Sequence, residues 1–150
     1  MTQLEEYNAH IGSDGYSDLK EKVNKIIADK NLTSYMNDTK WLELQNAIAD
    51  LPFPPPYSLK LVIDYHISNE PTQLSYAPQY IGDWSSYWNE GLPPFFNIEW
   101  IKVCPRYGKF RGRIINDEIL DETEEFITIL KKYNIPYEKD KENFIIYGYK

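Results

Sequence analysis

Apolar residues recur at the spacing of an α-helix in three parts of the chain. A helix with one buried face carries such residues three or four positions apart, and polar residues cover its other side. The pattern predicts helices over about 17–30, 37–50 and 117–133. Their apolar stripes are Leu19, Val23, Ile26 and Ile27, then Trp41, Leu44, Ile48 and Leu51, and finally Phe126, Ile129, Leu130 and Tyr133.

Strand patterns lie between the second and third predicted helices and again near the C-terminus. The alternation of apolar and polar residues over 58–67 predicts a half-buried strand. The run 95–103 is apolar in both side-chain phases, which is typical of a central strand. A short strand at 79–84 and a hairpin over 137–147 complete the set. The proline-rich stretch 51–57 is expected to form a stiff strap across the domain, in preference to a ligand for a proline-reading domain.

This order of elements predicts an α+β fold. We expect a single, mostly antiparallel sheet of about four to five strands, with three helices packed mainly on one face. A chain of 150 residues suits one domain spanning 1–150. Residues 1–16 carry scattered polar groups and glycines, so we expect them to form a loosely ordered lead-in.

The formal net charge is −7 at pH 7. Binding of nucleic acid over the whole surface would need a basic footprint, so the charge argues against it, whereas an acidic protein is steered towards a basic partner. No apolar run reaches the roughly 20 residues that span a bilayer. The acidic, polar N-terminus has no secretory pattern, so we expect a cytoplasmic protein without a membrane partner.

The chain offers no clear set of residues for catalysis or metal binding. His10, His66 and Cys104 are far apart in the sequence and lack the paired spacing of zinc sites. A Cys104 nucleophile with His66 as its base is a less favoured alternative to a small buried cysteine. We therefore predict no catalytic residue, no metal site and no cofactor, and we favour a protein that is not an enzyme.

Acidic residues leave two alternatives open. A magnesium site through Asp64, Asp83 and Glu99 is less expected than three solvated charges. Asp64 and Asp83 also precede Glu99 and Lys102 in an order that resembles a nuclease pattern. Residues three apart on a strand point to opposite faces, so Glu99 and Lys102 would share a face only if a β-bulge intervened.

The most basic stretch of the chain is 106–113. Its cations are candidate contacts for an anion or for RNA, and the rings of Tyr107 and Phe110 could stack on bases. The favoured alternative is that the six acids within 117–125 neutralise this stretch inside the protein. The candidate contacts are Arg106, Lys109, Arg111 and Arg113.

A second candidate surface lies at 74–92, where aromatic residues stand among small polar ones without a regular period. Tyr and Trp dominate binding hot spots, and an adjacent acid would pair with cations of a basic partner. Trp84 is predicted to plug the core, and Trp100 is predicted to lie within it. The residues predicted to bind a partner are Asp83, Tyr87 and Trp88.

Several strings follow one another in the second part of the chain. They are Leu-Pro-Phe-Pro-Pro-Pro-Tyr at 51–57, Ile-Glu-Trp-Ile-Lys-Val at 98–103, Pro-Arg-Tyr at 105–107, Lys-Tyr-Asn-Ile-Pro-Tyr at 132–137 and Ile-Tyr-Gly-Tyr at 146–149. Over about 32–150 the chain resembles an uncharacterised family of small bacterial proteins, a domain of unknown function. The resemblance implies no activity, cofactor or catalytic residue.

Acidity, 13 tyrosines and the missing catalytic set together favour a binding function. We expect a non-enzymatic protein-binding protein, above all an immunity protein that neutralises a bacterial toxin. Its partner would be a basic protein, such as a toxin domain. The alternative is an RNA-binding or RNA-processing protein that acts through the basic loop 106–113.

Overall fold

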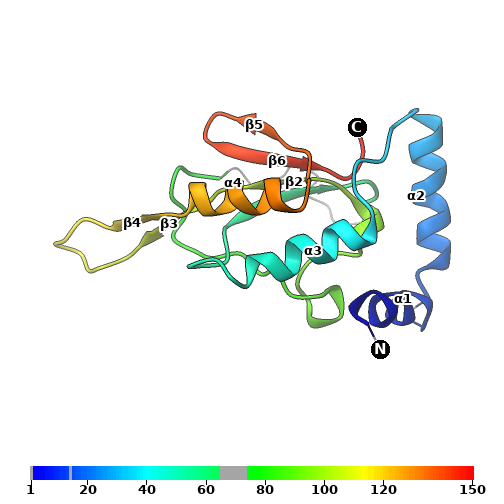
Figure 1. The fold of residues 1–150 in the computed structure, drawn as a ribbon, viewed down its shortest axis with the longest axis horizontal. Coiled ribbons are helices and arrows are strands. Elements are labelled where there is room, and N and C mark those ends of the chain that lie inside the picture. Colours follow the sequence, from blue (N-terminus) through cyan, green and yellow to red (C-terminus); the bar gives the residue numbers. More distant parts are fainter. Residues whose placement is uncertain (1, 14, 65–73) are drawn as a thin grey trace.

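The computed structural model describes residues 2–13, 15–64 and 74–150. Within these residues three α-helices come first, and a fourth lies between the strands of the second part of the chain (Figure 1). The α-helices are α1 (Gln3–Ser13), α2 (Ser17–Asp29), α3 (Asp38–Ile48) and α4 (Thr123–Lys132), and two short 3-10 helices are η1 (Tyr87–Asn89) and η2 (Phe95–Asn97). The strands are β1 (Tyr57–Leu61), β2 (Ile98–Val103), β3 (Arg106–Lys109), β4 (Glu118–Asp121), β5 (Glu138–Asp140) and β6 (Asn143–Tyr147).

The main sheet has four strands in the order β1-β2-β6-β5, and every neighbouring pair is antiparallel. Helices α3 and α4 lie over one face of it (Figure 1). The core forms where the apolar sides of these two helices meet the sheet, and the rings of Phe126 on α4 and Phe144 on β6 meet edge to face. The predicted α+β class and the mostly antiparallel sheet are therefore confirmed.

Three boundaries differ from the sequence prediction. Strand β1 ends at Leu61, and residues 65–67 of the predicted strand lie outside the described residues. Residues 79–84 contain no strand. The acids at 117–121 were assigned to a helix start but belong to a second, two-stranded sheet in which β4 pairs with β3. Helix α4 consequently begins at Thr123.

The N-terminal segment holds a fourth helix, α1, where a loosely ordered lead-in was expected. Its Tyr7 is 3% exposed and belongs to the core cluster. The Tyr7 ring stacks on Phe95 at 4.6 Å, and the Tyr7 hydroxyl accepts a hydrogen bond of 2.9 Å from the Phe95 backbone N–H. One aromatic contact and one buried hydrogen bond therefore fasten α1 to η2.

The strap over 51–57 is held from both sides. Phe53 is buried, as expected, and its backbone N–H donates to the Glu122 carboxylate at 3.1 Å. The indole N–H of Trp84 donates to the Pro55 carbonyl at 2.9 Å, so Trp84 is buried against the strap. Trp100, in contrast, is half-buried outside the core cluster, with the Lys102 ammonium 5.8 Å from its ring, and its predicted place in the core is wrong.

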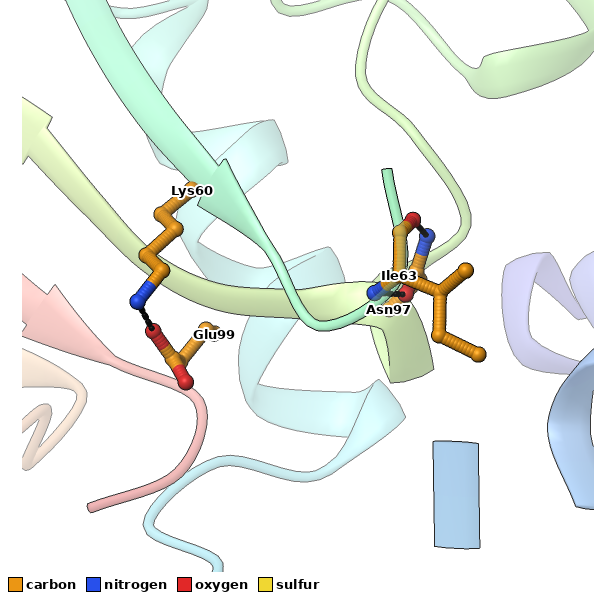
Figure 2. Close-up of polar contacts among 4 residues, drawn as sticks. All are labelled: Lys60, Ile63, Asn97 and Glu99. Carbon is orange, nitrogen blue, oxygen red and sulfur yellow. Dashed lines mark hydrogen bonds and ion pairs between the residues drawn. The ribbon is translucent and has the colours of Figure 1, made fainter. Parts of the chain in front are cut away.

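A β-bulge and one buried amide shape the end of β1. The register of β1 and β2 shifts between Lys60 and Leu61. Beyond the shift, the Asn97 side chain accepts from the Ile63 N–H and donates to the Ile63 carbonyl, both at 2.9 Å (Figure 2). Across the two strands, Lys60 and Glu99 form an ion pair of 2.9 Å (Figure 2). The side-chain amide of Asn97 thus supplies the hydrogen-bond partners of the Ile63 backbone after the regular strand pairing has ended.

Candidate functional site

The β3–β4 hairpin projects away from the body of the molecule (Figure 1). Its strands pair in register from Arg106 opposite Asp121 to Lys109 opposite Glu118. Beyond the paired part, the segment 110–117 forms the hairpin tip. Four large apolar side chains of this unit are exposed: Phe110 at 63%, Ile114 at 99%, Ile115 at 57% and Ile119 at 54%.

The tip is closed by contacts of its own. The Arg111 guanidinium donates two hydrogen bonds to the Asn116 carbonyl, at 3.0 and 2.8 Å. Gly112 has φ +120°, a conformation that side chains rarely adopt, so glycine is needed there. Gln79, from the loop beside β3, hydrogen bonds to Asp117. These contacts hold the tip through polar groups, and the apolar side chains of the tip remain exposed.

Exposed charges of both signs flank the apolar residues. Lys109, Arg111 and Arg113 are exposed on β3 and on the hairpin tip. Acids gather on β4 and at the root of the hairpin, where a groove of about 430 Å³ opens. The exposed acids of this region are Glu118, Asp121, Glu124, Glu125 and Glu142. The hairpin therefore combines an apolar and basic tip with an acidic root.

Arg106, predicted as a contact for an anion or RNA, lies inside the protein with 2% exposure. Its guanidinium donates to the Tyr76 carbonyl at 2.7 Å, to the Glu142 carbonyl at 2.8 Å and to Asn143 Oδ1 at 2.6 Å. It also stacks on the Tyr76 ring, with 4.4 Å from Cζ to the centroid. Arg106 thus joins the root of the hairpin to the β5–β6 turn, and its charge is not presented to a ligand.

The three residues predicted to bind a partner lie in two environments. Asp83 is exposed, but its carboxylate accepts from the Ser85 N–H at 3.0 Å and from the Ser85 hydroxyl at 2.5 Å. These bonds lower the pKa of Asp83. The carboxylate therefore stabilises a local turn while one side of it still faces solvent.

Tyr87 and Trp88 are half-buried beneath α1. The Trp88 ring stacks on His10 at 3.9 Å, and the Tyr87 ring meets those of Tyr7 and Tyr16 edge to face at 6.1 and 5.3 Å. Two aromatic rings thus lie against a helix of the same chain, so they contribute to its packing.

The geometry does not support a Cys104 nucleophile or a nuclease site. Cys104 is fully buried, which raises the pKa of its thiol, and His66 lies outside the described residues. The β-bulge that a nuclease pattern would need is present, but Glu99 and Lys102 form ion pairs with other residues. Glu99 pairs with Lys60, and Lys102 pairs with Asp140 at 2.7 Å.

A metal site was weighed for Asp64, Asp83 and Glu99. Across residues 2–13, 15–64 and 74–150, no group of three or more His, Cys, Asp or Glu side chains is arranged to hold a metal ion. The three carboxylates therefore do not form a common site among the described residues.

Comparison with known proteins places the chain in a family. Residues 23–150 match the family of unknown function DUF6678. The chain belongs to this family. The match begins within α2, so α1 and the first turns of α2 precede the part of this DUF6678 protein that it covers. No curated protein and no solved structure matches the chain.

In the part of this DUF6678 protein that the structure describes, no helix is long and apolar enough to cross a membrane.

Sequence reasoning missed the exposed apolar residues Ile114, Ile115 and Ile119, because they stand between cations and acids and break no periodic pattern. The signal that could have found them is the string Arg113-Ile114-Ile115-Asn116, an apolar pair in a glycine-containing turn between two charged strands.

Proposed function

We propose that this DUF6678 protein is a non-enzymatic, protein-binding protein that neutralises a bacterial toxin by docking the β3–β4 hairpin against it. One observation carries the proposal: four large apolar side chains are exposed together on a projecting hairpin. Exposed apolar clusters are uncommon on monomeric soluble proteins and are typical of protein interfaces. A buried partner pocket would cover such residues, and the free energy of burial would contribute to affinity.

A protein partner agrees with these side chains better than RNA does. Single-stranded RNA is bound by aromatic rings that stack on bases and by cations that contact phosphates. Phe110, Lys109 and Arg113 meet those needs, but the aliphatic side chains of Ile114 and Ile119 have no base to stack on. The internal position of Arg106 also removes one of the four predicted cations.

A basic toxin domain is the partner that the net charge and the acidic root of the hairpin favour. The net charge is −7, and the exposed acids at the root of the hairpin would face a docked partner. Toxins that act on nucleic acid are often basic, so these acids would speed the encounter and pair with cations at the rim of the interface. We place this activity in the cytoplasm, where the single cysteine Cys104 would stay reduced.

The proposal is tested by a pull-down with the protein encoded by the neighbouring gene, followed by a test of protection against that protein in cells. Capture together with protection supports toxin neutralisation. Failure of both removes it. Filter binding to RNA at two ionic strengths tests the alternative, since binding through phosphates would weaken steeply with salt. Binding to RNA without capture of a protein would favour the RNA-binding function.

A further inference from the structure

A pocket of about 230 Å³ lies between the N-terminal helices and the start of α3, on the side of the molecule away from the β3–β4 hairpin. Helices α1 and α2, the N-terminus of α3 and the segment η2 all contribute to its walls. The volume lies below the roughly 300–1,000 Å³ of drug-sized ligand sites, so a small metabolite is the appropriate size class.

Two opposite charges line this pocket. Asp38, in the first turn of α3, is half-buried, and Lys20 on α2 is exposed. Burial raises the pKa of Asp38, and the Lys20 ammonium opposes that rise. Among the described residues no direct ion pair joins them, and the Asp38 carboxylate accepts no hydrogen bond from a side chain or the backbone. Both charges therefore retain capacity to bind a ligand.

The rest of the wall is aromatic on one side and polar on the other. The rings of Trp41 and Phe95 stack at 5.9 Å, and both line the pocket. Tyr7 completes the aromatic side, and because its hydroxyl accepts the Phe95 N–H, its own proton is left to donate. The amides of Asn8 and Asn24 supply further donors and acceptors.

We propose that this pocket binds a free α-amino acid with an apolar or aromatic side chain. The Asp38 carboxylate would receive the α-ammonium group, and the Lys20 ammonium would receive the α-carboxylate. The ligand side chain would pack on Ile11 and Phe96, the half-buried apolar side chains of the wall, with the rings of Trp41 and Phe95 behind them. A simple amine would leave Lys20 unpaired and a simple acid would leave Asp38 unpaired, so the pair of charges selects a zwitterion.

The pocket depends on the N-terminal segment of this chain. Tyr7, Asn8 and Lys20 all precede the family match at residues 23–150. The proposal therefore concerns this chain and its α1–α2 segment, and it stands apart from the hairpin and from toxin binding.

The test uses the full chain and a panel of the common L-amino acids, followed by isothermal titration calorimetry. L-phenylalanine is compared with phenethylamine, which lacks the carboxylate, and with 3-phenylpropionate, which lacks the ammonium. We expect at least one apolar or aromatic amino acid to bind and both truncated analogues to bind about tenfold more weakly or worse. Binding of an analogue as tight as that of the amino acid, or no binding from the whole panel at about 1 mM, would overturn the proposal.

Two variants test whether Asp38 and Lys20 each bind the ligand. Asp38→Asn and Lys20→Met should each weaken binding about tenfold or more, whereas the exposed controls Asp50→Asn and Lys22→Met should bind as the parent does. If Asp38→Asn fails to fold, Lys20→Met and the comparison with phenethylamine still test whether the pocket binds a zwitterion. Equal loss in the controls, or no loss in Lys20→Met, would contradict the assignment.

Discussion

The backbone N–H of Phe53 donates a hydrogen bond of 3.1 Å to the buried carboxylate of Glu122. Within the described residues, the second oxygen of this carboxylate has no hydrogen-bond partner. Burial, with the nearby charges of Glu125 and Asp121, raises the pKa of Glu122 to about 7, and the Phe53 N–H opposes the rise. A carboxyl group in the core is thus held close to its titration point at neutral pH.

Glu122 should make the stability of the protein fall as the pH rises. Its folded pKa lies above the unfolded value of 4.5, so the folded chain holds the proton more tightly. The stabilisation that comes from the protonated Glu122 carboxyl group is fully present below about pH 4.5. It decreases as the pH rises and is lost at about pH 7. In urea denaturation, Glu122→Gln should remove this dependence, and the parent should lose up to about 3 kcal/mol relative to the variant between pH 4.5 and 8. Parallel pH curves for the two proteins would contradict this account.

Arg106→Lys should destabilise the fold by about 3 kcal/mol, because an ammonium cannot replace a planar group that bonds to three separate oxygens and stacks on Tyr76. Urea denaturation measures the change. Arg113→Lys, on the exposed tip, is the control and should stay within about 0.5 kcal/mol of the parent. Equal stability of the two variants would mean that the buried guanidinium contributes no more than a surface cation.

Asn97→Ala should cost about 2 kcal/mol, because both backbone groups of Ile63 lose their partner. Hydrogen exchange gives the specific readout: the Ile63 amide should exchange faster, while amides at the centre of β2 keep their protection. The exposed Asn116→Ala serves as the control. Unchanged exchange at Ile63 would show that the amide bridge of Figure 2 does not hold this segment.

Truncating both Tyr87 and Trp88 to Ala should destabilise the protein by about 3 kcal/mol and speed exchange in α1, because their rings pack on Tyr7 and His10. The exposed neighbours Tyr80 and Ile81 provide a matched double truncation that should have little effect on stability. A fully stable Tyr87/Trp88 variant with weaker partner binding would instead return the interface to the surface first predicted from sequence.

Sequence patterns located the elements whose burial is regular. Strand β2 was predicted because its apolar residues occupy both phases, and α3 because Trp41, Leu44 and Ile48 repeat at helical spacing. Helix α1 was missed because it buries a single residue, Tyr7, among polar ones. Strand β4 was missed because acids near a helix start satisfy the helix dipole equally well, and only its pairing with β3 identifies it.

The candidate site depends on contacts that no local pattern records. Arg106 looked like a surface cation because its acceptors lie 30 to 37 residues away in the sequence, at Tyr76, Glu142 and Asn143. Trp88 looked exposed because the helix that covers it was not predicted. The charges of Lys20 and Asp38 meet in one pocket only because α2 and α3 both pack against η2. Long-range packing therefore decided which polar and aromatic residues face solvent.

The most direct test of the central claim is the affinity of the hairpin tip for its protein partner. Isothermal titration with the protein encoded by the neighbouring gene would compare the parent with Phe110→Ser/Ile114→Ser and with the control Tyr80→Ser/Ile81→Ser, whose side chains are also exposed. Loss of two apolar anchors should weaken binding by about 3 kcal/mol or more, while the control binds as the parent does. Equal affinity of the tip variant and the parent would contradict binding through the β3–β4 hairpin.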